Sequence, residues 1–325
     1  MQINNNDLIF ERILFMKKIA YIVSAISAGL FSTAANADIS VSGSGSFAYT
    51  DAGGNSSSIM GGGVSFGLST TTDAGVSISA SSGVSLDNDS VNNSSGSTGV
   101  SMLTFGFANG TITLGDDVGV ADGKGKVGEI ATWSDTNLRG VSLTPGLTDD
   151  EGSGVAVTTT VGDMAIAAQY VWDGADAGDV DDSTKTSQGI SLTMPLGAAS
   201  LTIASASDES GSATTNEVAG AITMAVGGGS LSVGATSTDS DTANQEGEAY
   251  SVLYSTTVGG MSAKVGYTAY DVNNSTGQLT DVVLSSSLGG GASIWAEYSQ
   301  ATGTLAAASA SNNETVIAVG TSVSF

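Results

Sequence analysis

The chain of 325 residues contains no cysteine and no histidine, and it has only two prolines. Without cysteine there is no disulfide framework and no thiolate metal site. Without histidine the usual base that activates a serine nucleophile is missing, so we predict that the chain is not an enzyme and binds no cofactor. Glycine is abundant instead, with 45 residues. This composition favours an all-β protein, although a repetitive or disordered polymer could share it.

Basic residues are also scarce. Eight Lys and Arg stand against 32 Asp and Glu, which gives a net charge of −24 and makes nucleic acid an implausible partner. Long apolar runs are missing as well, because the run over residues 19–31 is shorter than the roughly 20 residues that a transmembrane helix needs. Any insertion into a membrane would therefore have to be as a closed barrel.

Residues 16–37 have the three parts of a secretory signal peptide. A positively charged start at Met16–Lys18 is followed by the apolar run and by a small-x-small cleavage site at Ala35–Ala37. Residues 1–15 do not fit the start of a signal, and we interpret them as an upstream extension from a misassigned start codon. Cleavage would leave residues 38–325 as the mature chain, with a net charge of −25.

The last twelve residues alternate between apolar and small or polar side chains. One face carries Ile317, Val319, Val323 and Phe325, and the other carries Ala318, Gly320, Ser322 and Ser324. Because successive side chains of a strand point to opposite faces, this is a strand with an apolar face and a small, polar face, which is typical of a membrane barrel. The terminal Phe325, with Val323, resembles the signal that the outer-membrane assembly machinery of Gram-negative bacteria recognises.

The same alternation recurs from residue 38 onwards between two kinds of connection. Short turns with the glycine or asparagine that tight hairpins need are predicted at 72–75, 108–110, 161–163, 195–197, 226–229, 258–260 and 288–291. Long polar loops are predicted at 51–58, 87–98, 117–152, 173–187, 208–216, 239–247, 272–277 and 301–313. Seven turns and eight loops imply sixteen strands, so residues 38–325 are predicted to form an antiparallel sixteen-stranded transmembrane β-barrel with short periplasmic turns and long outer loops.

Two details refine this prediction. Residues 99–107 carry apolar side chains on both faces, which indicates a bulge, a subunit contact or a misplaced strand. Aromatic residues at the strand ends are predicted to form girdles at both membrane interfaces. Those at the long loops are Tyr49, Trp172, Tyr250, Tyr270 and Tyr298, and those at the short turns are Phe107 and Phe325.

Three segments resemble Gram-negative general porins, most nearly the sixteen-stranded alphaproteobacterial type: residues 71–76, 110–120 and 288–294. The resemblance implies an outer-membrane homotrimer that lets small hydrophilic solutes and ions diffuse passively. It also implies that the third loop folds into the barrel and forms a constriction. The family element that leads into this loop is matched by Gly110, Gly115 and Asp116, and the loop that follows, 117–152, is the longest in the chain.

Charged residues around this loop are the candidate constriction residues. The acidic candidates are Asp116, Asp117, Asp122, Glu129 and Asp135, and the basic ones are Lys124, Lys126, Arg139 and Lys264. The family sets loop acids against a cluster of basic residues on the wall, whereas here Lys264 is the only basic residue placed confidently inside a strand and facing inward. Acidic rings concentrate cations, so we predict a cation-preferring channel.

Three alternatives stay open. Asp173, Asp176, Asp179 and Asp181 could bind Ca²⁺ weakly, but they lack EF-hand spacing and could equally be solvated loop charges. The inward residues Gln169, Asp281, Trp295 and Glu297 could contact solutes or simply line the wall. A structural or adhesive β-rich surface protein without channel activity is the second functional class, although the fixed-length repeats that would favour it are not found in the sequence.

Overall fold

The computed structural model describes most of the chain after residue 37. The described residues are 38–52, 55–85, 100–116, 118–120, 124–125, 127–128, 130, 153–172, 185–210, 213–241, 246–272, 275–303 and 315–325. The proposed extension, residues 1–15, and the proposed signal peptide, residues 16–37, lie outside them. No helix among the described residues is long and apolar enough to cross a membrane.

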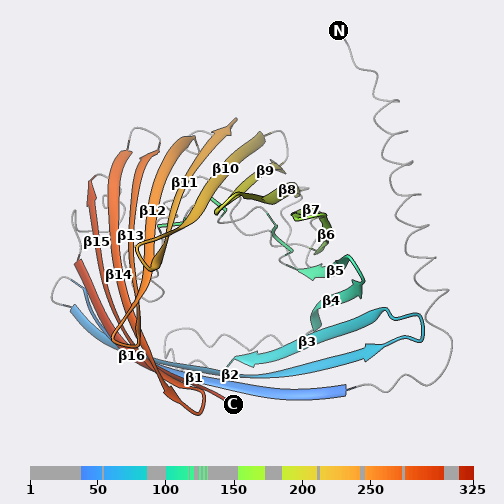
Figure 1. Cartoon of the computed structure of the whole chain (residues 1–325), viewed down its shortest axis with the longest axis horizontal. Coiled ribbons are helices and arrows are strands. Elements are labelled where there is room, and N and C mark those ends of the chain that lie inside the picture. The colour runs from blue at the N-terminus through green and yellow to red at the C-terminus, as the bar shows by residue number, and fades with distance from the viewer. Residues whose placement is uncertain are drawn as a thin grey trace, which may run out of the picture.

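Sixteen strands account for almost all of the described residues. They are β1 (Asp38–Ala52), β2 (Asn55–Thr71), β3 (Ser77–Ser85), β4 (Val100–Phe107), β5 (Gly110–Asp116), β6 (Ser153–Val161), β7 (Met164–Trp172), β8 (Lys185–Leu196), β9 (Ala199–Ser210), β10 (Ala213–Val226), β11 (Gly229–Ser240), β12 (Gly247–Val258), β13 (Met261–Val272), β14 (Ser275–Gly289), β15 (Ala292–Gly303) and β16 (Thr315–Ser324). Each strand pairs with its sequence neighbours, and β1 pairs with β16, so the sheet is a closed antiparallel barrel (Figure 1). The predicted strand number and topology are confirmed.

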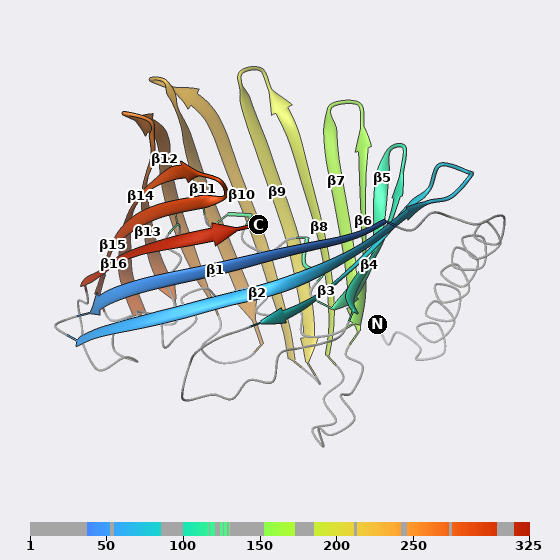
Figure 2. The ribbon, with the colours of Figure 1, turned by 90° about the horizontal axis from the view of Figure 1, so that it is seen from below.

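The strands run at a slant to the barrel axis, as closure of a sheet requires, and Figure 2 shows their tilt from the side. Tight hairpins join them at one end. Gly162 and Gly197, for example, have φ values of 61° and 63°, a conformation that side chains with a Cβ rarely adopt. Every short turn that the sequence predicted falls between two strands of the barrel.

The chain terminus completes the seam between β1 and β16. Beyond the last strand residue, the Phe325 N–H donates to the Gly43 carbonyl at 3.0 Å, and the Gly43 N–H donates to the Phe325 carbonyl at 2.8 Å. The ring of Phe325 lies over Gly43, where a Cβ atom would come within 2.4 Å of it. Glycine at position 43 therefore leaves the space that the final aromatic ring occupies beside the neighbouring strand.

Several predicted long loops are shorter than expected. Only two residues separate β1 from β2, β9 from β10, and β13 from β14, because the paired strands extend well into the predicted loops at 51–58, 208–216 and 272–277. The polar residues in these segments belong to hairpin ladders that continue to the tip and not to loops, as the pairing of Ala52 with Asn55 shows. The alternation of long and short connections is thus less strict than predicted.

The irregular segment before residue 107 contains a bulge, as one of the predicted alternatives had it. The register between β3 and β4 shifts between Ser81 and Ser82, opposite Met102 and Val100. A bulge lets a strand change phase relative to its partner. Past it, Met102 takes the same face as Thr104 and Gly106, while Leu103 and Phe105 take the other.

Candidate functional site

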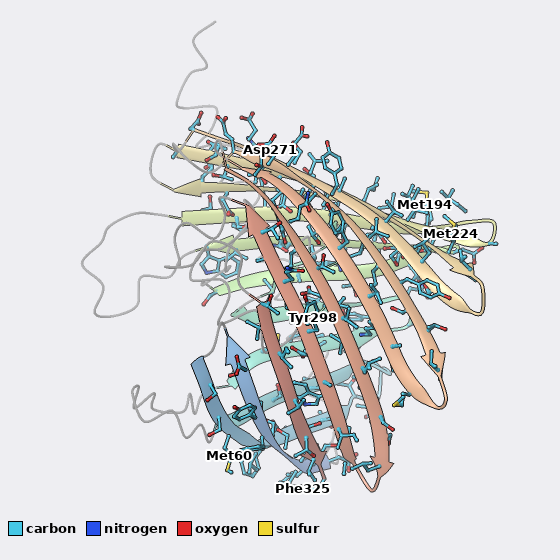
Figure 3. The ribbon with its side chains drawn as sticks, turned by 90° about the vertical axis from the view of Figure 1, so that its left-hand side faces the viewer. Met60, Met194, Met224, Asp271, Tyr298 and Phe325 are labelled. Carbon is cyan, nitrogen blue, oxygen red and sulfur yellow. The ribbon has the colours of Figure 1, made fainter. Side chains whose placement is uncertain are left out.

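The two faces of the barrel wall have opposite chemistry. On the outer face, large apolar side chains are exposed, including Val218 at 60% and Val258 at 57%. Figure 3 shows Tyr298 and Met224 on the outside of the strands. The inner face alternates with it and carries mainly Ser, Thr, Ala and Gly, with several acidic side chains. This is the reverse of a soluble protein, which places its apolar face inside.

The inner face is accessible in some places and covered in others. The inward serines of β3, Ser77, Ser79 and Ser81, are exposed, as is Ser69 on β2. On β6 to β16, by contrast, many inward side chains nearer the long-loop end are buried. Something therefore covers one side of the interior, and the opposite side stays open to solvent.

Part of that cover is the start of the loop after β5. Val118 is buried and packs against Ala156 of β6 and Val171 of β7, with Val120 beside them. The Val120 N–H donates to the side-chain oxygen of Gln169 on β7. Gln169 was predicted to contact solutes or to line the wall, and its amide instead holds the loop backbone.

Further along, the loop lies directly on the wall formed by β11, β12 and β13. The Ser251 hydroxyl of β12 donates to the Gly125 carbonyl at 2.9 Å. A Cβ on Gly128 would lie 2.5 Å from the Tyr267 carbonyl oxygen of β13. Short pieces of this segment appear in green inside the ring in Figure 1.

A third anchor lies on β14. The Ile130 N–H donates to Asp281 Oδ2 at 3.4 Å, and the Ser299 hydroxyl of β15 donates to Asp281 Oδ1 at 2.5 Å. Asp281 is 0% exposed. Its carboxylate therefore joins the wall to the loop rather than facing the open interior.

Only some of the predicted constriction residues fall within the described parts of the chain. Asp116 ends β5 opposite Ser153, Lys124 is exposed, and Lys264 is exposed on the inner face of β13 between Ser255 and Val283. The others lie outside the described residues, and their roles stay predictions. They are Asp117, Asp122, Glu129, Asp135, Lys126 and Arg139.

Two acidic side chains lie on the inner face in addition to the predicted Asp281 and Glu297. They are Asp208 of β9 and Glu217 of β10. Among the inward side chains that the structure describes, Lys264 is the only basic one. The phase of the strand predicts Glu217, because it alternates with the exposed Val218. Asp208 falls in the predicted loop 208–216, so no strand phase is predicted for it.

Tyr270 is a correction to the predicted aromatic girdle. It is 3% exposed and packs on the inner face with Ala249, Leu279 and Val316. Tyr270 stands in register with the inward Ala249 rather than with the outward Tyr250. The outer aromatics at this end are Tyr49, Trp172, Tyr250 and Tyr298, as predicted.

The predicted Ca²⁺ site cannot be placed, because Asp173, Asp176, Asp179 and Asp181 lie outside the described residues. Within the described ranges, no group of three or more acidic side chains is arranged to hold a metal ion.

These features define a closed sixteen-stranded antiparallel β-barrel with an apolar outside, a polar inside and a loop segment on its inner wall. No protein-family model matches the sequence, and no curated protein matches it either. Solved structures do match in fold.

Three such structures illustrate the match. A porin refined at 1.8 Å resolution matches with a TM-score of 0.69 and 18% identity over 89% of this chain and 100% of that one. The anion-selective porin from Comamonas acidovorans has a TM-score of 0.67 and 16% identity, with the same coverage. The trimer form of OmpT, an outer membrane protein of Vibrio cholerae, has a TM-score of 0.66 and 13% identity over 89% and 99%. At these identities the similarity establishes the fold.

Proposed function

We propose that the chain is an outer-membrane porin, a passive diffusion channel for small hydrophilic solutes and ions. The observation that carries the proposal is the inverted barrel wall. Its large apolar side chains are exposed on the outside, while serines such as Ser77 and Ser79 are exposed on the inside. Such a wall is stable between lipid and water and would be unstable in water alone.

The outer surface supports a membrane location. Exposed aromatics lie near the long-loop end, at Tyr49, Trp172 and Tyr250, where the aromatic girdle of a membrane barrel meets the lipid headgroups. Phe325 is 81% exposed at the seam, in a position where the assembly machinery of a Gram-negative outer membrane can reach it. Together with the signal-like residues 16–37, these features favour export and insertion from the periplasm.

The interior supports a channel. A barrel of eight strands is filled by its own side chains, whereas one of sixteen leaves an aqueous lumen. The exposed inward serines agree with that expectation, and the loop contacts at Gly125, Gly128 and Ile130 place backbone against one side of the wall. Solutes would therefore pass between this loop and the opposite wall of β2 and β3, with the loop limiting their size.

The charge of the interior favours cations. Asp208, Glu217 and Glu297 lie on the inner face with Lys264, and negative walls concentrate cations and repel anions. The Comamonas acidovorans porin of the same fold is anion-selective, so the charges, rather than the fold, must set the preference. Asp116 stands in register with Ser153 and the outward Trp172, so the predicted loop acids Asp122 and Glu129 are the ones to test. Changing Asp122 and Glu129 together to Asn should lower the cation preference, and an unchanged ion selectivity would remove these two residues from the account.

A homotrimer is the proposed assembly. The resemblance to porins implies it, and OmpT of Vibrio cholerae is known in a trimer form. The mass of the detergent-solubilised particle, corrected for bound detergent, distinguishes three chains from one.

The test is to reconstitute folded protein in a planar bilayer and to measure current steps and the reversal potential in a KCl gradient. Discrete steps, in groups of three for a trimer, with a cation-selective reversal potential support the proposal. Steps without cation selectivity retain the channel and refute the charge argument. Folded protein that never conducts favours the structural or adhesive surface protein.

A further inference from the structure

Two inward glycines in the middle of strands call for a physical reason. Gly234 of β11 and Gly266 of β13 are both buried, and neither has a positive φ. Glycine inside a strand costs about 0.5–1 kcal/mol relative to alanine. Where no unusual backbone conformation requires it, the usual reason is the close approach of another backbone.

That other backbone is the loop. A Cβ on Gly234 would lie 2.1 Å from the Gly125 carbonyl oxygen, and one on Gly266 would lie 2.0 Å from the Gly128 carbonyl oxygen. Seen from the loop, a Cβ on Gly125 would lie 2.3 Å from the Ala235 carbonyl oxygen of the wall. Each close atom belongs to the main chain, so no side-chain rotation can relieve the clash. At this separation both members of each pair have to be glycine, and any other residue requires the loop to move away from the wall.

The order of the contacts also agrees on the two sides. Gly125 lies against Gly234 of β11 and accepts a hydrogen bond from Ser251 of β12. Gly128 lies against Gly266 of β13, and the Ile130 N–H donates to Asp281 of β14. Successive described residues of the loop therefore contact successive strands from β11 to β14.

We propose that Gly234 and Gly266 are positioning residues that set how closely the loop lies against the wall, and hence how wide the channel is; this inference rests on the proposed channel function. A methyl group at either position needs a separation of more than 3 Å from the loop carbonyl, so the loop must move by about 1 Å towards the middle of the lumen. The anchors at Gln169 and Asp281 hold the loop inside the barrel, so it is displaced and not released.

The test compares Gly234→Ala and Gly266→Ala with Gly83→Ala in single-channel recordings. Gly83 is an inward glycine of β3 where a Cβ would lie 3.7 Å from its nearest neighbour, so the control adds the same methyl group to the wall without touching the loop. We expect a lower single-channel conductance in Gly234→Ala and Gly266→Ala, and the native conductance in Gly83→Ala. Conductance that is unchanged or raised in Gly234→Ala and Gly266→Ala overturns the proposal.

A second measurement on the native protein does not depend on folding of the variants or on conduction. Amide hydrogen exchange of the peptide that covers residues 124–130 should be slow, because Gly125 and Gly128 are buried against the wall. If Gly266→Ala folds, exchange in this peptide should accelerate. Exchange at the rate of an unstructured peptide in the native protein refutes the docking, whereas slow exchange in a protein that does not conduct refutes the channel and keeps the docking.

Discussion

Lys264 offers the sharpest test of how charge controls the channel. Its side chain is exposed on the inner wall, two residues from the Gly266 contact with the loop, which is about 7 Å along a strand. An ion passing about 7 Å from its charge feels about 0.6 kcal/mol in water, and about half of that at 0.1 M salt. Lys264→Glu changes two unit charges and shifts cations and anions in opposite directions. At 0.1 M salt, the difference between the free energies of K⁺ and Cl⁻ at this point should therefore change by about 1.2 kcal/mol, and the permeability ratio of K⁺ to Cl⁻ should rise about eightfold.

The assay is the reversal potential across a planar bilayer with a tenfold KCl gradient centred at about 0.1 M. Lys264→Gln should give about half the free-energy change, a rise of about threefold, and raising the salt should shrink both effects. Glu209→Gln, on the exposed outer rim of β9, is the matched control and should leave the ratio unchanged. Identical reversal potentials for the native protein and Lys264→Glu would refute the reasoning that the inner wall sets selectivity.

Two further predictions concern stability and assembly. Thr268 is 0% exposed, and its hydroxyl has no hydrogen-bond partner among the described residues, so Thr268→Val should raise the free energy of unfolding in detergent by about 1 kcal/mol. Thr193→Val should lower the free energy of unfolding by a similar amount, because the Thr193 hydroxyl is hydrogen-bonded to the Thr202 hydroxyl at 2.9 Å. Equal losses of stability in Thr268→Val and Thr193→Val would contradict this reasoning. Phe325→Ala keeps both backbone hydrogen bonds to Gly43. This variant should refold in detergent with nearly native stability but reach the outer membrane of cells less well. Deletion of Phe325 should lower both the stability in detergent and the amount assembled in cells. Unimpaired assembly of Phe325→Ala in cells would remove the terminal ring as an assembly signal.

Much of the barrel could be predicted because its wall follows a strict period of two. The alternation at Ile317–Phe325 and the glycines at the short turns predict the number and order of the strands, because side-chain period and turn conformation are local properties. The ends of the loops were harder to predict. Ser, Thr, Asn and Asp are compatible with both a loop and the tip of a solvated hairpin, so β1 and β2 could not be extended to Ala52 and Asn55 from the sequence.

The inner site could be predicted only in part, because it depends on contacts between distant segments. Lys264 was placed correctly by its phase within a strand. The roles of Gln169 and Asp281 in holding the loop could not be predicted. Nothing in the local sequence shows that the backbone N–H groups of Val120 and Ile130 will reach these two side chains. Gly234 and Gly266 carried one signal, namely glycine in the middle of otherwise regular strands. Their partners in the loop could only come from the structure.

The central claim is that the barrel encloses an open, water-filled passage narrowed by the loop. Swelling of liposomes that contain the folded protein, in iso-osmotic solutions of neutral sugars of increasing size, tests it most directly. The account predicts fast swelling with the smallest sugars and a decline with size, with a slower rate in Gly266→Ala than in Gly83→Ala. Folded, inserted protein that admits no sugar at all would contradict it.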